Sequence, residues 1–271
     1  MQINFLDDFH LEDVQNPEHP SDFVSMEDHS ILILRLPEIQ NSDLYVISYA
    51  FIIKDEICFV YDREKNDFIK IGSLMDMNDF LDEKTNQLLK YLKDYYREVD
   101  MLEDRLYDSS LNKNFMSKWL TFKKELSLIY RLIFDVALSF ELFMAHHKKY
   151  STFEELAYAD VYEHIERIRD LAKISLDKLD HLYDFYRAKV DEKMNRNVYY
   201  LTLLSGIFLP LTLLSGFFGM NTGGLPFLND PNGTLKVVLI AIVLELLIFI
   251  PFIFINMHKT KKYTHKKEKY E

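Results

Sequence analysis

One carboxylate in this sequence lies where a charge is costly. Glu245 is the single charged residue in the apolar run from Val237 to Asn256. An ionised carboxylate in the middle of a hydrocarbon layer costs several kcal/mol unless it is neutralised or paired. Two kinds of chemistry suit such a residue. We favour a protonated carboxyl group bonded to a hydroxyl of a neighbouring span; the alternative is a proton carrier in proton-coupled transport.

The other charged residues favour the handling of cations over enzyme chemistry. The formal net charge is −11, and since the last fifteen residues carry +4, residues 1–256 carry −15. Such a chain attracts cations and repels nucleic acid. The nine histidines show no HxxxH spacing, and no nucleotide loop or nucleophile motif is present, which disfavours a built-in zinc cage or an enzyme. Cys58 is the only cysteine, so an internal disulfide is excluded and a reducing compartment is expected.

Two apolar runs near the C-terminus predict membrane spans. Residues 198–218 contain no charge over twenty-one positions, the length that a helix needs to cross a hydrocarbon core of about 30 Å. Residues 235–256 form the second predicted span, and the glycines, prolines and asparagines of residues 219–234 predict a tight extracytoplasmic loop.

The distribution of lysines predicts the orientation of these spans. Lysines crowd residues 257–271, so the positive-inside rule places this tail in the cytosol, and after two crossings the N-terminal part as well. Residues 1–20 have neither a basic start nor an apolar run, so no signal peptide is expected. We therefore expect a two-span protein of the cytoplasmic (inner) membrane.

The N-terminal part, residues 1–150, is predicted to be an α+β cytosolic domain. Strand patterns cover residues 31–36, 43–62 and 67–72, and Lys54-Asp55 is the predicted hairpin turn.

Long helices are predicted after the last strand. Apolar residues recur at three- and four-residue spacing over residues 76–108 and 114–148. A third helix is predicted to start at a capping box of Ser151 with Glu154. No Gly or Pro interrupts the chain from there to Gly206. We therefore expect one helix of more than sixty residues, with residues 151–197 as a cytosolic stalk that continues into the first span.

A series of short motifs around the first span resembles a known family. The chain carries, in this order, Met194-Asn195, Leu201-Thr202, IFLPLT over residues 207–212 and GFFGMN over residues 216–221. In order and spacing they resemble the signature of the CorA-type magnesium channels, which ends in Gly-Met-Asn at the outer end of the first span. YADVYEH over residues 158–164 also resembles a family segment. The clear similarity covers about residues 155–265.

The resemblance implies a funnel-shaped homopentamer in membrane lipid, with a pore lined by five copies of the first span. The implied selectivity filter is Gly219, Met220 and Asn221. The implied pore lining is Asp184, Asn195, Val198, Leu201, Ser205, Leu209, Thr212 and Gly216, which fall mainly at three- and four-residue steps on one helix face. Mg²⁺ sheds its water reluctantly, so amide, hydroxyl and carbonyl oxygens suit its hydration shell. Leucine side chains from the five copies, meeting at one level of the pore, can form a constriction that excludes water.

Several of these positions have a purely structural alternative. Gly216 and Gly219 can serve helix termination and close packing. Asn195 and Thr212 can be ordinary interhelical hydrogen-bonding residues, and the leucines can face lipid or core.

The resemblance also implies a regulatory metal between subunits at Asp160. Its partner carboxylate is expected to be Asp76 or Asp79, near the junction of the last strand and the first long helix. The alternative is that Asp160 is a solvated residue of an acidic stalk.

The loop after Asn221 leaves the transported metal open. The magnesium-type pattern has an aromatic residue and then Met-Pro-Glu, whereas this chain has TGGLPF with Phe227 in the acidic position. An NxGGxP loop is more similar to the zinc-transporting ZntB branch, although that branch commonly has Val or Ile in place of Met220. We therefore expect a channel for Mg²⁺, with Co²⁺ or Ni²⁺ as further ions, and keep a ZntB-type zinc transporter as the alternative. A two-span sensor or scaffold is a third hypothesis, which leaves the Gly-Met-Asn motif unexplained. No covalently bound cofactor is expected.

Overall fold

The computed structural model describes residues 6–40, 43–108, 114–220, 223–227, 229–247 and 250, and the chain divides into two compact units, Met1–Lys189 and Val190–Glu271. The elements are α1 (Asp8–Gln15), β1 (Asp22–Ser25), β2 (Ser30–Gln40), β3 (Asp43–Lys54), β4 (Ile57–Asp62), β5 (Asp67–Ser73), α2 (Leu74–Asp108), α3 (Phe115–His147) and α4 (Glu155–Phe218). Residues 233–247 of the second unit are also helical.

The five strands form an antiparallel meander in the order β1-β2-β3-β4-β5. Side chains of a strand alternate between the two faces of the sheet. Leu32, Leu34 and Leu36 of β2 therefore join the core shared with the long helices, whereas Ile31 and Ile33 join a smaller cluster with Val14 of α1. Both faces of the sheet are thus covered, which explains why β2 reads as a nearly continuous apolar run.

The β3–β4 turn differs from the predicted one by a single residue. Lys54 pairs with Ile57, so the two turn residues are Asp55 and Glu56, with φ values of 50° and 63°. The prediction of a turn at Lys54-Asp55 was wrong because Lys54 still belongs to the strand ladder.

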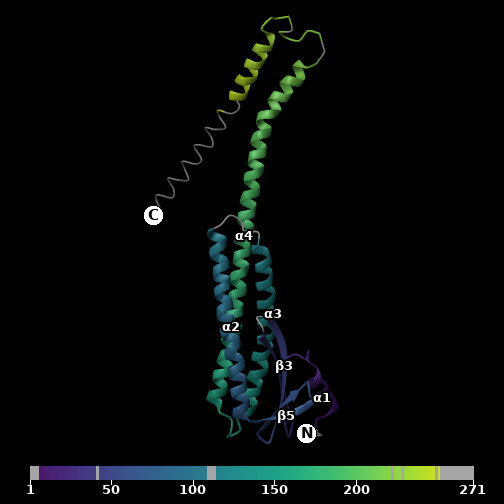
Figure 1. Ribbon diagram of the computed structural model, residues 1–271, viewed down its shortest axis with the longest axis vertical. Coiled ribbons are helices and arrows are strands. Elements are labelled where there is room, and N and C mark those ends of the chain that lie inside the picture. The colour runs from purple at the N-terminus through teal and green to yellow at the C-terminus, as the bar shows by residue number, and fades with distance from the viewer. Residues whose placement is uncertain are drawn as a thin grey trace, which may run out of the picture. The chain divides into compact units, whose positions relative to one another are not determined.

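The long helices α2, α3 and the first part of α4 lie side by side in the first unit, with the sheet next to them (Figure 1). The helices predicted over residues 76–108 and 114–148 are confirmed with ends that differ by at most two residues. Trp119 of α3 donates a hydrogen bond from Nε1 to the Leu179 carbonyl of α4 at 2.8 Å. Tyr158 of α4 donates from its hydroxyl to the Leu74 carbonyl at the start of α2, at 2.6 Å.

The predicted single helix of more than sixty residues is confirmed, since α4 contains 64 residues. Its start was predicted too early. Ser151 and Thr152 lie in a turn, and the buried Phe153 stacks on Tyr158 before the helix begins at Glu155. The capping box of Ser151 with Glu154 was therefore wrong, because an N-cap residue must directly precede the first helical residue.

Candidate functional site

The second unit presents an uncharged helix face. Asn195, Val198, Leu201, Ser205, Leu209, Thr212 and Gly216 of α4 are all exposed. At about 100° per residue these positions fall within an arc of about 120°. Among the described residues, α4 is the helix that is long and apolar enough to cross a membrane, and none of its apolar window is buried inside the chain. Within the part of the chain that the structure describes, no residue therefore covers this apolar part of α4.

The hydroxyl groups of this segment bond to their own helix. Thr212 donates to the Phe208 carbonyl at 2.7 Å, and Thr202 donates to the Val198 carbonyl at 2.8 Å. The proton of each hydroxyl is therefore used within the helix, and the oxygen keeps lone pairs that can accept from water. Water molecules around a metal cation point their hydrogens outward, so such oxygens suit a hydrated cation.

The glycines at the end of α4 differ in what requires them. A Cβ added at Gly219 would lie 2.9 Å from the Ser215 carbonyl oxygen, so the backbone of the helix end itself requires a glycine there. A Cβ added at Gly216 would meet no atom within 4 Å. Gly216 is therefore not required by the described chain, and the space beside it is open to another copy or to an ion. Met220 is exposed, and the predicted filter residue Asn221 lies outside the described residues.

Glu245 lies within the helical residues 233–247 and is half-buried. Its Oε1 atom is buried and, within the described part of the chain, has no hydrogen-bond partner. The proposed bond to a hydroxyl of the first span and the alternative proton-carrier role both stay predictions.

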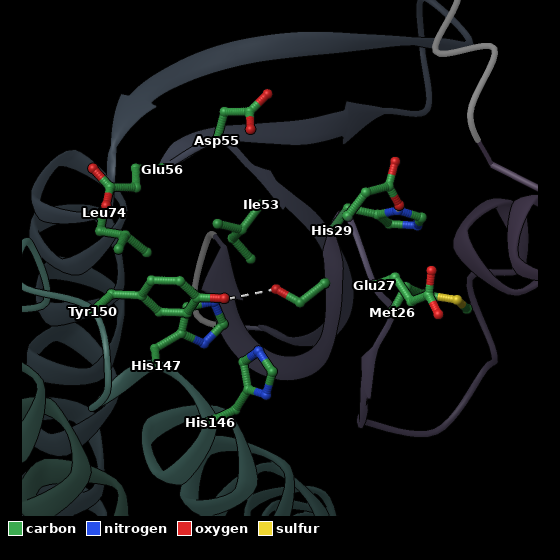
Figure 2. Close-up of a pocket in the computed structure, with 12 residues that line it drawn as sticks. Met26, Glu27, His29, Ile53, Asp55, Glu56, Leu74, His146, His147 and Tyr150 are labelled. Carbon is green, nitrogen blue, oxygen red and sulfur yellow. Dashed lines mark hydrogen bonds and ion pairs between the residues drawn. The ribbon is translucent and has the colours of Figure 1, made fainter.

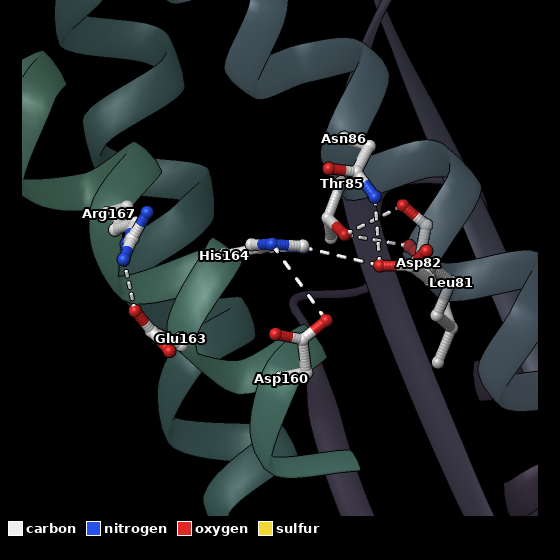
Figure 3. Close-up of polar contacts among 8 residues, drawn as sticks. All are labelled: Leu81, Asp82, Thr85, Asn86, Asp160, Glu163, His164 and Arg167. Carbon is white, nitrogen blue, oxygen red and sulfur yellow. Dashed lines mark hydrogen bonds and ion pairs between the residues drawn. The ribbon is translucent and has the colours of Figure 1, made fainter. Parts of the chain in front are cut away.

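In the first unit, Asp160 belongs to a cluster of possible metal ligands. Asp160 and His164 of α4 point toward Asp82 of α2 (Figure 3). His164 Nδ1 lies 3.2 Å from Asp82 Oδ1, and His164 Nε2 lies 4.0 Å from Asp160 Oδ2. One ligand atom from each residue fits within 4.8 Å of the others, close enough for one ion to contact all three.

The imidazole of this cluster is poorly satisfied. His164 Nδ1 is buried, and although Asp82 is close, no hydrogen bond of good geometry forms. Asp82 itself accepts a hydrogen bond from Asn86 Nδ2 at 2.9 Å. A buried ring nitrogen facing carboxylates without a hydrogen bond fits a site that a metal can enter. Sequence reasoning missed Asp82 and His164; the four-residue step from Asp160 to His164 was the available signal.

The two carboxylates predicted as partners of Asp160 behave differently. Asp76 accepts hydrogen bonds from the Ser73 backbone N–H and from the Ser73 hydroxyl, both at 2.7 Å, and these bonds hold the pKa of Asp76 below its usual value. Both carboxylates are exposed, and Asp76 is engaged by Ser73 at the start of α2. The predicted partnership crosses a subunit boundary, so it stays a prediction.

A cavity of about 470 Å³ lies where the sheet meets the end of α3. The β1–β2 and β3–β4 connections bring Glu27, Asp28, Asp55 and Glu56 to it, and α3 brings His146 and His147 (Figure 2). Burial lowers the pKa of His147 to about 4, so its ring is neutral near pH 7. His147 Nδ1 donates to the Phe143 carbonyl at 3.0 Å, and Nε2 accepts from the Ser30 hydroxyl at 3.2 Å.

This cavity has an acidic lining but is not a metal cage. Asp28 forms an ion pair with Lys54 at 2.8 Å, and both nitrogens of His147 already have partners. Among the described residues, the group of Asp82, Asp160 and His164 meets the distance requirement for a metal ion, and no group in this cavity does.

Comparison with known proteins supplies the family context. The model of the family described as "CorA-like Mg2+ transporter protein" matches residues 2–262. The zinc transport protein ZntB of Vibrio parahaemolyticus is 28% identical over 144 residues, which cover 52% of this chain and 45% of ZntB. The cobalt/magnesium transport protein CorA of Thermotoga maritima is 36% identical over 72 residues, which cover 27% of this chain and 20% of CorA. The chain thus spans about half or less of the length of these curated relatives.

A solved structure shows the same fold. The complete structure of the CorA magnesium transporter from Methanocaldococcus jannaschii aligns with a TM-score of 0.73 at 19% sequence identity, covering 91% of this chain and 82% of that one. The predicted fold class, an α+β domain followed by a very long helix, is confirmed.

Proposed function

We propose, from the premise that this chain belongs to the family of CorA-like Mg²⁺ transporter proteins, that it moves divalent metal cations across a membrane through a pore built from several copies of α4. The family is one of transporters rather than enzymes. The observation that carries the proposal is the exposed, uncharged face of α4 from Asn195 to Gly216, which leads in sequence into Gly219, Met220 and Asn221.

A single copy of this face cannot enclose an ion. The resemblance implies five copies around one axis, and five identical helices bring five equivalent oxygens to each level of the pore. Rings of oxygens that contact the hydration shell pass an ion faster than a tight carboxylate cage does, because the ion must also leave. Thr212 and Asn195 fit this role inside the span, and the amide of Asn221 fits it at the outer end.

The apolar positions of the same face fit a closed state. Leu201 and Leu209 are 64% and 75% exposed, so no other described residue of the chain covers them. Five leucines at one level form an apolar constriction that excludes water, and a hydrated ion cannot pass it until the helices separate.

The topology follows the same proposal. Residues 198–218 and 235–256 cross the cytoplasmic membrane, residues 219–234 connect them outside, and both chain ends are cytosolic. At a potential of −100 mV a divalent cation gains about 4.6 kcal/mol on entry, so passive uptake can proceed against a concentration ratio of roughly a thousandfold.

Mg²⁺ is the leading cargo, with Co²⁺ or Ni²⁺ as further ions. One observation favours Zn²⁺ as the alternative. The TGGLPF loop lacks the acidic residue of the magnesium-type pattern, and zinc transport proteins are among the relatives of this chain. In that alternative Glu245 carries the coupled proton.

We also propose that the cluster of Asp82, Asp160 and His164 is the regulatory metal site, completed by a neighbouring copy. The two carboxylates are hard ligands, and the imidazole is a borderline ligand. Mg²⁺ would use the carboxylates alone, whereas Co²⁺, Ni²⁺ or Zn²⁺ would also use the ring nitrogen of His164.

Metal-resolved flux tests the proposed function. The purified protein is reconstituted in liposomes with an indicator for Mg²⁺, Co²⁺, Ni²⁺ or Zn²⁺ inside, and an inside-negative potential is imposed. We expect potential-driven Mg²⁺ uptake without acidification of the lumen. Zn²⁺ uptake that acidifies the lumen supports the zinc alternative. Absence of flux for all four ions contradicts transport and favours a sensor or scaffold.

A further inference from the structure

The connection between the two predicted spans contains one carboxylate, and a lysine close behind it forms an ion pair with it. Residues 197–256 contain three charged side chains, which are Asp230, Lys236 and Glu245. Lys236 lies in the first turn of the helical residues 233–247, and Glu245 lies nine residues further along that helix. In the proposed topology Asp230 is therefore the single carboxylate that each copy presents outside the membrane.

Both oxygens of the Asp230 carboxylate are engaged within the second unit. Lys236 donates from Nζ to Oδ2, and the Asn232 backbone N–H donates to Oδ1 at 2.9 Å. These two hydrogen bonds hold the pKa of Asp230 below its usual value, so the carboxylate is ionised at neutral pH. Lys236 Nζ also lies 5.7 Å from the centre of the Phe227 ring, within the range of a cation–π contact. The ammonium group is thus held by a carboxylate and an aromatic ring.

The backbone of the connection brings these three side chains together. Phe227 has a φ of 67°, and its carbonyl accepts a hydrogen bond from the Asp230 N–H at 3.2 Å. The Asp230 carbonyl accepts from the Gly233 N–H at 2.9 Å. A Cβ added at Gly233 would clash with the Phe227 carbonyl oxygen, so the chain can fold back this closely only at a glycine. Side chains of a helix lean toward its N-terminus, and Lys236 therefore reaches back to Asp230.

A lysine at this place is unfavourable by itself. The first turn of a helix carries the positive end of the helix dipole, which repels a cation. Lysines that flank membrane spans also favour the cytosolic side, whereas the proposed topology places Lys236 outside. A lysine at the end of a span normally extends toward the lipid headgroups. The ammonium group of Lys236 instead turns to Asp230 and Phe227.

The ion pair has a larger effect on charge than on stability. The side chains of Lys236 and Asp230 are 51% and 28% exposed, and exposed ion pairs contribute little to stability. The charges of the pair cancel, however, and no other charged residue lies between Asn197 and Glu245. The outer part of each copy is therefore neutral only because Lys236 accompanies Asp230.

We propose that Lys236 is a tethered counter-ion, which occupies the place of a divalent cation at Asp230 and keeps the outer entrance of the ion path neutral. This inference rests on the proposed function. In an assembly of identical copies, unpaired Asp230 carboxylates would repeat around the entrance and attract cations strongly. An ion held there must leave again before it reaches the pore, so a neutral entrance avoids a strong outer binding site.

The tether explains how a single positive charge can exclude a double one. A group linked this closely to its partner acts at an effective concentration on the order of millimolar or more. Free cations at lower concentration therefore do not displace Lys236 from Asp230. Removal of one partner leaves the charge of the other uncompensated, so the two single neutralisations have opposite effects on cations, and the double neutralisation cancels them.

Mn²⁺ binding tests the inference without any flux. The full chain is titrated in detergent at 0.02 M salt, and free Mn²⁺ is measured by electron paramagnetic resonance. We expect Lys236→Gln to bind at least about one more Mn²⁺ per assembly than the wild type, because the ion takes the place of the ammonium group. The extra binding should be absent when Asp230→Asn is added, and absent from Lys90→Gln, a control at an exposed lysine of α2. No extra binding in Lys236→Gln, or extra binding that persists with Asp230→Asn, would overturn the proposal.

Uptake in liposomes tests the consequence for transport. At 0.02 M salt and a Mg²⁺ concentration well below saturation, we expect Lys236→Gln to raise the initial rate about threefold and Asp230→Asn to lower it about threefold. The variant with both substitutions should return toward the wild-type rate, and these differences should shrink near 0.5 M salt. Lys90→Gln should have no effect.

The two measurements separate the possible failures. Equal losses of uptake in both single variants would mean that the pair only holds the connection in shape, and the inference would fail. Extra Mn²⁺ binding with unchanged uptake would place Asp230 away from the ion path, which also contradicts it. If the wild type carries no flux of any ion but the Mn²⁺ results are as expected, the proposed function fails and Lys236 remains the counter-ion of Asp230.

Discussion

The two parts of α4 differ in what covers them. Before residue 190, a seam repeating every seven residues is buried against α2 and α3, and Ile168 is fully buried. After residue 190, every residue as far as Thr202 is exposed, and Leu204 is 51% exposed. One continuous helix thus obtains its stability from its own chain in the first part. In the second part the described residues do not cover it, and in the proposed assembly lipid and other copies supply the packing that stabilises a helix.

The largest effect is expected from a substitution just beyond the second part of α4, at the outer end of the proposed pore. Asn221→Ala deletes the amide proposed for the filter, and we expect uptake to fall to the level of empty liposomes while assembly is unchanged. The reason is that an amide contacts a hydrated cation without chelating it, and a methyl group cannot. Uptake is measured in liposomes and assembly by native mass spectrometry. The assembly is expected to be a pentamer, and wild-type uptake by a well-assembled variant would remove the filter assignment.

Matched truncations compare the two parts of α4 directly. Ile168→Ala removes a fully buried side chain and is expected to lower the free energy of unfolding of the first unit by about 3 kcal/mol. Leu204→Ala shortens an exposed side chain of the second unit and is expected to change that free energy by less than about 0.5 kcal/mol.

The fluorescence of the single tryptophan, Trp119, provides the signal for this comparison. Trp119 stacks on Tyr183, with ring centroids 4.8 Å apart, so its fluorescence reports on the first unit alone. Denaturant titration in detergent gives the unfolding midpoint for each variant. A loss from Leu204→Ala as large as that from Ile168→Ala would show that the two parts are stabilised together.

Acid should weaken the first unit through His147. Burial lowers the pKa of His147 to about 4, with His146 and Lys149 acting in the same direction, whereas an unfolded histidine titrates near 6.5. The unfolded chain therefore binds more protons between these values. The stabilising contribution is complete above about pH 6.5 and is lost as the pH falls toward 4, by at most ~3 kcal/mol.

The matched variant for this prediction is His147→Gln, whose amide can still donate to the Phe143 carbonyl and accept from Ser30. We expect Trp119 unfolding midpoints to fall less between pH 7 and pH 4.5 in this variant than in the wild type. Identical pH profiles would assign the acid sensitivity to other groups.

The smallest expected effect concerns regulation. Asp160→Asn removes one charge per copy from the proposed regulatory site. The channel should then need a severalfold higher internal Mg²⁺ concentration to close, and its ion selectivity should be unchanged. Current recordings of this variant are compared with Asp104→Asn, an exposed neutralisation on α2. An unchanged inhibition curve would make Asp160 a solvated stalk residue and would shift gating to other carboxylates or to a proton at Glu245.

Helices that show in the sequence as a regular spacing of apolar residues were predictable. Features that depend on the contacts of particular side chains were not. Apolar spacing predicted α2, α3 and the unbroken α4, because helical periodicity persists over many turns. The strand β1 and the helix α1 were missed, since β1 has four residues and α1 buries only Val14. The start of α4 was misplaced because the side chain of Phe153, packed against Tyr158, determines the turn that precedes the helix.

The candidate site divides in the same way. The face from Asn195 to Gly216 was implied by the family resemblance, and its helical steps agree with a single face. Its side chains are exposed, and its role as a pore lining stays a prediction. Asp82 was not predictable as a neighbour of Asp160, because it is distant in sequence and approaches only through the packing of α2 on α4, whereas His164 could have been found from its four-residue step.

The strand β4 contains the only thiol of the chain, and this has a practical consequence. Cys58 is fully buried, and burial, with the nearby Asp76, raises the pKa of its thiol to about 12. Maleimide and methanethiosulfonate reagents react with the thiolate, which Cys58 scarcely forms at neutral pH. A cysteine introduced at an exposed position of α4 would then be the one reactive thiol of each copy, and Cys58 would not have to be removed first. Spin labels or fluorophores attached there could follow the separation between copies as metal is added.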